Sequence, residues 1–269
     1  MEKESTKRRK EQILALLEEK NMVLVEELCQ RFDVSKVTIR KDLNELGNQG
    51  LLVRTHGGAG KVKETAFERS QEAKEKERIA EKRAIARRAY EELHNNETMI
   101  LDAGTTTQEL AKLICSGSKK NLTVITNAFN IAEELIGCEK SELIFTGGYV
   151  RSHILSCVGM YGEDMLKNVC VDRTFLGCNN LSVEHGLTTP NMQECRMKQY
   201  MLAAAKKCYV LEDSTKFRTN SLYCVCQVKD LHLIITDDGI GDIYKEKIKE
   251  RGGPCGCSGS QAIKTTITD

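Results

Sequence analysis

The sequence predicts two parts of different fold class: an N-terminal winged helix-turn-helix and a longer α/β domain built on a parallel sheet. Residues 1–60 show three amphipathic helical patterns, followed by a short strand and a glycine turn. Beyond residue 94, apolar runs of strand length alternate with helical stretches, which is typical of a parallel sheet covered on both faces. Between these parts, residues 61–93 are heavily charged around a thin apolar stripe, as in a linker helix.

The three N-terminal helices follow from the spacing of apolar residues. Residues 13–17 supply the apolar face of the first helix. Within residues 25–32, apolar side chains recur at i, i+3, i+4 and i+7, which places them on one helical stripe. A polar turn ends at Ser35, a residue type that caps helices. Apolar residues then recur on one face of a third helix over residues 39–46.

A strand and a tight turn follow the third helix, in the position of a wing. Residues 51–55 form the predicted strand, and His56–Ala59 contains two adjacent glycines, whose backbone freedom suits a tight turn. The expected domains are a winged helix-turn-helix unit at 1–60, a charged linker helix at 61–93, an α/β domain at 94–251 and a flexible tail at 252–269.

Apolar runs in the second part are predicted to be buried strands. They are 99–101, 122–125, 143–145, 174–176, 209–211 and 233–235. The helices predicted between them are 107–115, 128–136, 160–168 and 191–206. Ligands of open α/β sheets collect at the carboxyl ends of the strands, so a ligand site is expected in the turns that follow these runs.

Composition limits the class of protein without naming a ligand. The chain has 269 residues, 40% of them hydrophobic, and a formal net charge of +1, so we expect a sizeable core, while the overall charge favours no partner. The sequence shows no signal peptide and no apolar run of roughly 18 residues, and we expect a cytoplasmic protein with no membrane segment. The 12 cysteines show no C-x-x-C spacing; we expect reduced structural thiols and neither metal nor cofactor, a metal site being the alternative.

The face of the third helix opposite its apolar stripe carries residue types that suit DNA. Arginine and lysine bind phosphates or guanine edges, asparagine binds adenine, and valine or threonine methyl groups pack on thymine. Candidates on this helix and the wing are Ser35, Lys36, Val37, Thr38, Arg40, Lys41, Asn44, Arg54 and His56. The basic run 7–10 is a further candidate for phosphate contacts. Because residues 1–60 contain eleven Lys and Arg against ten Asp and Glu, a small bundle with solvated charges is the alternative.

Three turns in the second part share a strand-end pattern. Residues 101–107 follow a strand and open a helix, and they supply a glycine, three threonine hydroxyls and free N–H groups that favour an anion. Thr126–Asn127 and Thr146–Gly148 follow the next two strands. Residues 101–107 lack the Gly-Lys-Thr ending of a Walker loop. An ordinary strand-helix turn capped by threonine is the alternative reading.

Both parts resemble the DeoR family of bacterial sugar-metabolism repressors, over roughly residues 6–250. In the first part the resemblance is carried by Arg9–Ile13, Val25–Leu28, Val34–Leu43 and His56–Ala59. In the second it is carried by Leu101–Thr107, Asp172–Asn180, Gly186–Pro190, Glu194, Lys198 and Asp213–Phe217. The resemblance implies that the third helix enters the major groove. It also implies that the second domain resembles sugar-phosphate isomerases and coenzyme A transferases in fold and binds a phosphorylated sugar.

The resemblance also implies an effector site. The phosphate would be held by Gly104, Thr105, Thr106 and Thr107, with Asn127 and Gly148 nearby. The sugar would face Asp102, Asp172, Asn179, Glu194 and Lys216. For Asp172 and Glu194 a structural salt bridge is the alternative, whereas a lysine suits a phosphorylated ligand.

Two departures from the family qualify these expectations. Gly47 stands where the family continues the helix, so DNA recognition is expected to rest on an earlier, shorter stretch. Asn179 and Asn180 stand where the related isomerases carry carboxylates, and an amide cannot accept a proton for catalysis.

The expected function is that of a DNA-binding transcription regulator, a repressor of carbohydrate metabolism genes. It would bind double-stranded operator DNA as a homo-oligomer and respond to a phosphorylated sugar effector. The alternatives are a sugar-phosphate isomerase and, third, a purely architectural DNA-binding protein.

Overall fold

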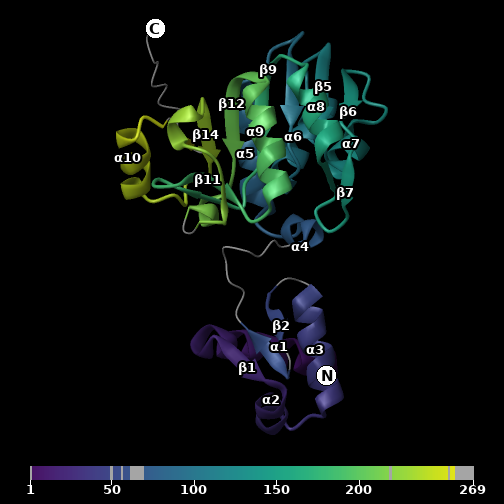
Figure 1. Ribbon diagram of the computed structural model, residues 1–269, viewed down its shortest axis with the longest axis vertical. Coiled ribbons are helices and arrows are strands. Elements are labelled where there is room, and N and C mark those ends of the chain that lie inside the picture. Colours follow the sequence, from purple (N-terminus) through teal and green to yellow (C-terminus); the bar gives the residue numbers. More distant parts are fainter. Residues whose placement is uncertain are drawn as a thin grey trace. The chain divides into compact units, whose positions relative to one another are not determined.

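The computed structural model describes residues 2–48, 51–55, 57–60, 70–217, 220–253 and 255–257. The chain divides into two compact units, Met1–Ala73 and Lys74–Asp269 (Figure 1). Of the predicted features, His56, residues 61–69 of the charged segment 61–93, and the tail beyond residue 257 lie outside the described residues.

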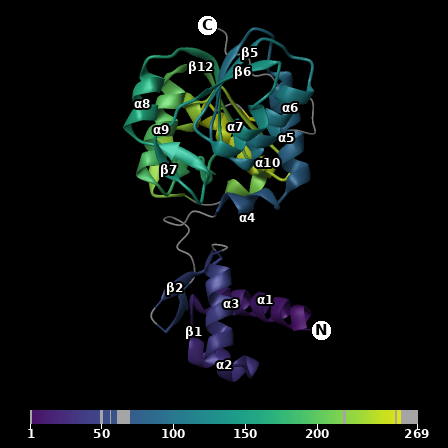
Figure 2. The same cartoon turned by 90° about the vertical axis from the view of Figure 1, so that its right-hand side faces the viewer.

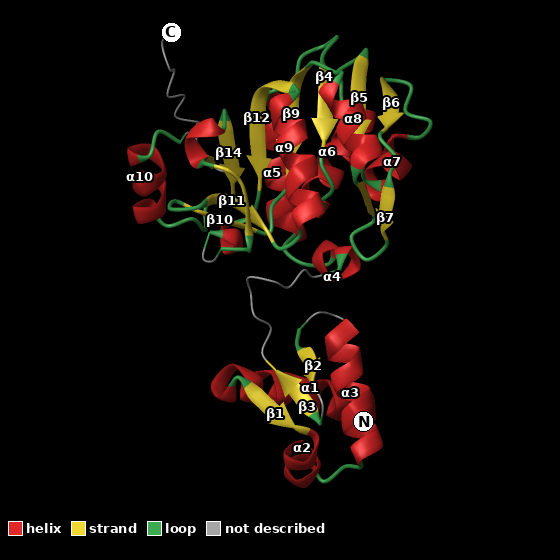
Figure 3. Ribbon diagram, in the orientation of Figure 1, coloured by secondary structure: helices red, strands yellow, loops and turns green. Residues whose placement is uncertain are grey.

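The first unit contains helices around a small antiparallel sheet (Figure 3). Its elements are α1 (Glu2–Lys20), β1 (Met22–Leu24), α2 (Val25–Phe32), α3 (Lys36–Asn48), β2 (Val53–Thr55) and β3 (Gly58–Gly60). The strand order is β1-β3-β2, so β3 pairs with its wing partner β2 on one side and with β1, the strand that precedes α2, on the other. The core is one cluster to which all three helices contribute, including the predicted stripe Ile39, Leu43 and Leu46.

Helix α3 includes Gly47 and continues to Asn48. A Cβ at Gly47 would lie 3.4 Å from Cγ of Arg54 and 3.7 Å from Cδ1 of Leu52, which are ordinary van der Waals distances. The helix therefore does not end at this glycine, and it stays a prediction that DNA recognition rests on the stretch before it.

A seven-stranded parallel sheet forms the centre of the second unit. Its order is β15-β14-β12-β9-β4-β5-β6. The strands are β4 (Thr98–Leu101), β5 (Leu122–Thr126), β6 (Ser141–Phe145), β9 (Val171–Leu176), β12 (Ala205–Leu211), β14 (Leu233–Thr236) and β15 (Cys255–Cys257). All six predicted apolar runs fall in these strands.

Helices cover both faces of this sheet (Figure 2). One face packs on α5 (Ile79–Glu91), α6 (Thr105–Ser116) and α7 (Phe129–Leu135). The other packs on α8 (Met160–Lys167), α9 (Met192–Ala203) and α10 (Asp242–Glu250), together with an antiparallel sheet. That sheet has the order β10-β11-β13, formed by β10 (Asn180–Ser182), β11 (Gly186–Thr189) and β13 (Tyr223–Cys226). Neighbouring residues of β12 alternate between the two cores, as a strand buried on both faces requires.

Short elements complete the described chain. They are α4 (Gln71–Glu75), the hairpin β7 (Tyr149–Arg151) and β8 (Ser156–Val158), and the 3-10 turns η1 (Ser214–Lys216) and η2 (Val228–Asp230). Of these elements the sequence predicted only α4, which lies within the expected linker helix 61–93.

Three segments differ from their predicted roles. Helix α5, expected within a linker, buries Ile85, Ala86, Ala89 and Leu93 in the core of the second unit. The helix expected at 191–206 ends at Ala203, because the chain from Ala205 already pairs in β12. Residues 255–257, expected in a flexible tail, pair with β14 as strand β15.

Candidate functional site

The first unit presents the predicted DNA-facing side of α3. Ser35 caps the helix, since its Oγ accepts a hydrogen bond from the N–H of Thr38 at 3.2 Å. With Ile39 and Leu43 fully buried, the opposite side of the helix is exposed. The residues exposed there are Ser35, Lys36, Val37, Arg40, Lys41 and Asn44, and Thr38 is half-buried.

Two cations and one apolar side chain on this face are free to meet a ligand. Arg40 and Lys41 are exposed and form no ion pair or hydrogen bond with any described residue. Val37 is 74% exposed, so packing inside the unit does not explain why an apolar residue occupies this position. This combination matches a surface that contacts phosphates and a thymine methyl group.

Other predicted contact residues already have partners. Lys36 pairs with Glu26 at 2.7 Å, although both side chains are largely exposed. Arg54 donates from Nε to Oδ1 of Asn44 at 3.0 Å and from Nη1 to the carbonyl of Gly58 at 2.6 Å. Arg54 therefore ties the wing to α3, and the bond orients Asn44 so that its amide N–H groups are free to donate.

The basic run 7–10 does not act as a unit. Nε of Arg9 lies 2.6 Å from Oδ2 of Asp42, whose side chain is 4% exposed, and Lys10 pairs with Glu45. These ion pairs hold α1 against α3. The expectation that the whole run grips DNA was therefore wrong, because two of its cations are engaged inside the unit.

In the second unit, the predicted turns meet at the carboxyl edge of the sheet. Leu101 lies beside Thr126 on one side and beside Phe175 on the other. The strand register therefore places Asp102, Asn127 and Gly177 next to one another. Glu212 follows β12 at the same edge, where its carboxylate accepts a hydrogen bond from the N–H of Cys178.

The three threonine hydroxyls at the start of α6 differ in whether they already form a hydrogen bond with a described residue. Thr107 is fully buried, and its Oγ1 donates to the carbonyl of Asp102 at 2.7 Å. The hydroxyls of Thr105 and Thr106 bond to no described residue. Gly104 supplies no capping side chain, and the first helical bond runs from Gln108 to the Gly104 carbonyl at 3.2 Å. The helix thus presents free N–H groups and two free hydroxyls, a combination that favours an anion.

A chain of buried charges crosses the edge beside this turn. Nζ of Lys198 pairs with Oδ2 of Asp102, lies 3.3 Å from Oε1 of Glu194, and donates to the carbonyl of Gly177 at 2.8 Å. Glu194 in turn pairs with Arg151 at 3.0 Å. Burial alone would lower the pKa of Lys198, but the two carboxylates outweigh it and raise that pKa. Lys198 is therefore a permanent cation, and Asp102 and Glu194 are its counter-ions.

Glu212 and Lys216 form a second charged group at this edge. Burial raises the pKa of Glu212 to about 7, while the positive charge of Lys216 acts in the opposite direction. Lys216 is half-buried and forms no ion pair with a described residue. This lysine is thus a cation at the edge that an anionic ligand can use.

Gly148 and Asn179 also lie in strand-end loops of this edge. A Cβ at Gly148, where φ is +123°, would lie 2.7 Å from the carbonyl oxygen of Val158, so glycine allows the loop to approach β8. Asn179 accepts a hydrogen bond from the hydroxyl of Thr189 at 3.2 Å, which ties the loop after β9 to β11.

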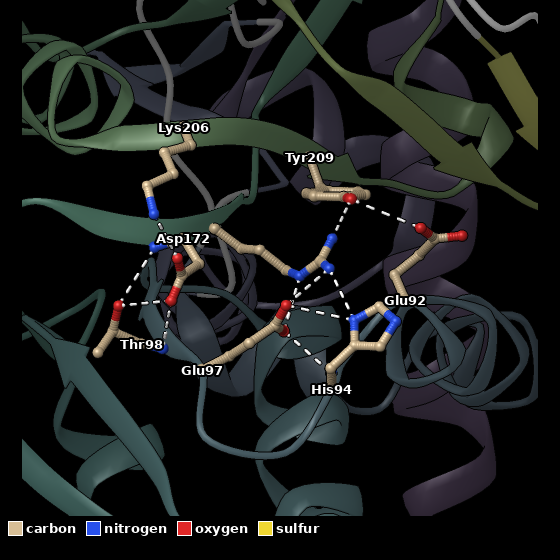
Figure 4. A network of polar contacts seen from close by, with 8 residues as sticks. Glu92, His94, Glu97, Thr98, Asp172, Lys206 and Tyr209 are labelled. Carbon is tan, nitrogen blue, oxygen red and sulfur yellow. Dashed lines mark hydrogen bonds and ion pairs between the residues drawn. The ribbon is translucent and has the colours of Figure 1, made fainter.

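Asp172 does not join the other predicted residues. It lies at the amino end of β9, where its carboxylate accepts from Thr98 at 2.9 Å and pairs with Lys206 at 2.8 Å (Figure 4). The hydrogen bond from Lys206 leads the contacts that lower the pKa of Asp172 to about 2. Its expected contact with the sugar was wrong, because the strand separates it from the carboxyl edge.

The neighbouring Arg173 belongs to the same structural network. Its guanidinium forms two hydrogen bonds of 2.8 Å with Glu97 and another with the hydroxyl of Tyr209. His94 and Glu92 extend this network (Figure 4). These paired charges stabilise the amino edge of the sheet.

Sequence reasoning missed part of the carboxyl edge. Glu212 directly follows the predicted strand 209–211, so the strand-end rule would have found it. Lys198 stands four residues after Glu194, a spacing that places both on one face of a helix. Arg151 gave no signal, because its role depends on its contact with Glu194, which is distant in sequence.

The described residues show neither a membrane helix nor a metal cluster. No helix among them is long and apolar enough to span a bilayer. In the same part of the chain, no three His, Cys, Asp or Glu side chains are placed to hold a metal ion. No disulfide joins the cysteines whose side chains the structure describes, and Cys170 is exposed.

Comparison with known proteins accounts for both units. Residues 9–65 match the DeoR-like helix-turn-helix domain, and residues 77–238 match the DeoR C-terminal sensor domain. These matches and the parallel sheet confirm the expected fold class.

Curated relatives extend over nearly the whole chain. The HTH-type transcriptional regulator GlpR of Haloferax volcanii is 37% identical over 246 residues, 91% of this chain and 94% of the relative. A putative aga operon transcriptional repressor of Escherichia coli O157:H7 is 37% identical over 251 residues, 92% of each chain. Among solved structures, ribose 5 phosphate isomerase A from Neisseria gonorrhoeae aligns with a TM-score of 0.38 and 14% identity, over 51% of this chain and 53% of the isomerase. The chain thus spans about half the length of that enzyme but nearly all of the regulators, and it belongs to the DeoR family of helix-turn-helix transcription regulators.

Proposed function

We propose that this chain is a repressor of carbohydrate metabolism genes that responds to a phosphorylated sugar. It binds double-stranded operator DNA through α3 and the wing, as a homo-oligomer whose symmetry matches paired half-sites. The effector binds at the carboxyl edge of the parallel sheet. The observation that carries the proposal is that the uncapped start of α6 and the unpaired Lys216 both follow central strands at that edge.

The free groups at this edge suit a phosphate ester. The hydroxyls of Thr105 and Thr106 and the N–H groups of α6 supply hydrogen-bond donors, and Lys216 supplies a positive charge. The paired charges of Asp102, Lys198 and Glu194 give the site a fixed polar wall. An effector that binds one conformation of the protein better than another would shift its affinity for DNA by the same factor.

We favour the regulator over the alternative that the chain is a sugar-phosphate isomerase. The family is one of transcription regulators, and it matches the chain in both units. In addition, Lys198 neutralises Asp102, so this carboxylate is an ion-pair partner and not an available base.

The DNA half of the proposal is tested by fluorescence anisotropy. The full chain is titrated onto labelled duplex from upstream of its own gene, at several salt concentrations. Lys41→Ala should weaken binding to all sequences and reduce the slope of log affinity against log salt by about 1. Arg40→Ala should cost about 1–3 kcal/mol on the preferred sequence.

A matched control removes a cation of the second unit. Lys229 is exposed and forms no ion pair with a described residue, so Lys229→Ala should leave both affinity and salt slope unchanged. Equal behaviour of the Lys41 and Lys229 variants would refute the assignment of α3 to the groove.

The effector half is tested on the same complex with a panel of pentose and hexose phosphates. One compound should change DNA affinity in the wild type, and Thr105→Leu should abolish that response while preserving DNA affinity. A response that persists in Thr105→Leu would place the phosphate elsewhere.

A further inference from the structure

Two buried asparagine side chains at the carboxyl edge each leave an acceptor unused. Asn127 follows β5 and is 2% exposed, and Asn130 lies in the first turn of α7 and is 4% exposed. In both, Oδ1 is buried and accepts no hydrogen bond. Most buried polar atoms in proteins are bonded, and one left unsatisfied costs about 1–3 kcal/mol. Two such atoms near one turn therefore require an explanation.

The orientation of the Asn130 amide is fixed by a chain of donors. The carboxylate of Glu134 can only accept, so Nε2 of Gln108 must donate to it, at 3.0 Å. Oε1 of Gln108 then accepts from Nδ2 of Asn130, also at 3.0 Å. The same Nδ2 lies 3.4 Å from the carbonyl of Gly104, which again can only accept. The free atom of Asn130 is therefore its oxygen, and turning the amide over would break these bonds.

Asn127 is fixed in the same way from the other side. Its Nδ2 donates to the carbonyl of Cys157 in β8 at 2.8 Å. Its backbone carbonyl accepts from the N–H of Cys157 at the same distance. Both asparagines thus donate from Nδ2 to backbone or side-chain acceptors, and the Oδ1 of each accepts no hydrogen bond.

These oxygens border the anion site without being able to bind an anion. Asn130 touches Gly104, which directly precedes α6, and Asn127 follows the strand beside Asp102. A phosphate oxygen placed against either Oδ1 would meet an acceptor and be repelled. A hydroxyl group would instead donate to it and satisfy the buried oxygen.

We propose that Asn127 and Asn130 select the effector by accepting hydrogen bonds from its hydroxyl groups, beside a phosphate held at the start of α6. This inference rests on the proposed effector site. It specifies the ligand class as a polyhydroxylated phosphate ester, and it separates that class from inorganic phosphate and from phosphate esters stripped of hydroxyls.

Calorimetric titration of the full chain tests this selection. The probes are inorganic phosphate, glucose 6-phosphate, fructose 6-phosphate and ribose 5-phosphate, with 2-deoxyglucose 6-phosphate and 2-deoxyribose 5-phosphate as matched deoxy compounds. In the wild type, at least one sugar phosphate should bind more than tenfold tighter than inorganic phosphate. Asn130→Leu, which is similar in size, should weaken that compound about three- to tenfold and leave the affinity for inorganic phosphate unchanged.

A control variant removes an asparagine that lies outside this network. Asn168 is exposed at the end of α8, before β9, and donates to the carbonyl of Asp164, so Asn168→Leu should preserve the preference for the sugar phosphate over inorganic phosphate. Thermal unfolding checks that each variant folds, and Asn130→Ala replaces Asn130→Leu if the larger side chain destabilises the domain.

The possible outcomes distinguish a failure of this inference from a failure of the proposed function. If the wild type and both Asn130 variants bind the sugar phosphate with equal affinity, the role of the asparagines is refuted and the proposed effector site is not. That result would mean that water satisfies Oδ1 of Asn130. Failure of every sugar phosphate to bind the wild type better than inorganic phosphate overturns the effector proposal and this inference together.

Discussion

Replacing Lys198 with methionine tests whether the buried charges at the carboxyl edge form one unit. The side chains of Lys198 and Asp102 are 1% and 2% exposed. Methionine has a similar length but no charge, so Asp102 would keep only the N–H of Gly177 at 3.1 Å. Breaking a buried ion pair from one side costs about 3–5 kcal/mol. We expect Lys198→Met to lose that amount of unfolding free energy at pH 7.

The pH dependence of this loss follows from the stranded carboxylate. In the variant, burial without a counter-ion raises the pKa of Asp102 above its unfolded value of about 3.9. A raised pKa contributes stability that is complete below the unfolded pKa and is lost as pH rises through the folded one. The deficit of Lys198→Met should therefore shrink as the pH is lowered from 8 towards 5.

Urea unfolding followed by far-UV circular dichroism measures the effect, since the chain has no tryptophan. Only the transition of the second unit should move. The double variant Asp102→Asn/Lys198→Met should recover much of the loss because it removes the stranded charge of Asp102, while Glu194 keeps its ion pair with Arg151. Lys206→Met is the matched control, since Lys206 is 73% exposed and solvent screens its ion pair with Asp172. A deficit below about 1 kcal/mol for Lys198→Met, or one that Asp102→Asn does not relieve, would refute the reasoning.

Three further substitutions give distinct outcomes. Gly47→Ala should stabilise the first unit by about 0.5–1 kcal/mol, because alanine favours a helix and the nearest side-chain atom would lie 3.4 Å from its Cβ. Thermal unfolding measures this change. A lower melting temperature would mean that the wing cannot move to make room for the methyl group. Asp172→Asn should cost about 1 kcal/mol at pH 7 after solvent screening and leave the effector response unchanged. The hydrogen bond from Lys206 leads the contacts that lower the pKa of Asp172 to about 2, so in urea titrations this deficit should fade as the pH drops from about 4 towards 2. Gly148→Ala should destabilise the second unit by more than about 1 kcal/mol, because its Cβ would meet the Val158 carbonyl at 2.7 Å with φ at +123°; an unchanged melting temperature would contradict this.

The elements that sequence predicted are those whose pattern is local. An apolar run such as 122–125 is buried on both faces, and the stripe from Ile39 to Leu46 repeats with the period of a helix, so both can be recognised without knowing their neighbours. The hairpin of β7 and β8 and the small sheet are strands of three or four residues with no such pattern. These strands are too short for a period to show, and β13 pairs with β11, which lies far from it in the sequence.

The sequence predicted which kinds of residue form the candidate site, but not the role of each residue in it. Three consecutive threonines pointed to an anion, yet only the structure shows that Thr107 bonds to the carbonyl of Asp102 while the other two hydroxyls stay free. Likewise, Arg9 and Lys10 look like part of a DNA-binding run until their partners Asp42 and Glu45 are seen on α3. A residue type states what a side chain can do, and its neighbours decide whether that capacity is already used.

Asp102 and Asp172 show where a stricter use of the sequence would have sufficed. Both aspartates flank predicted strands, and both were expected to face the sugar. Asp102 follows its strand, however, while Asp172 precedes the run 174–176. In a parallel sheet all the strands point the same way, so residues before and after them lie on opposite edges. Strand direction alone therefore separates the two, and it places Asp172 with Thr98 at the structural edge, where the contacts are found.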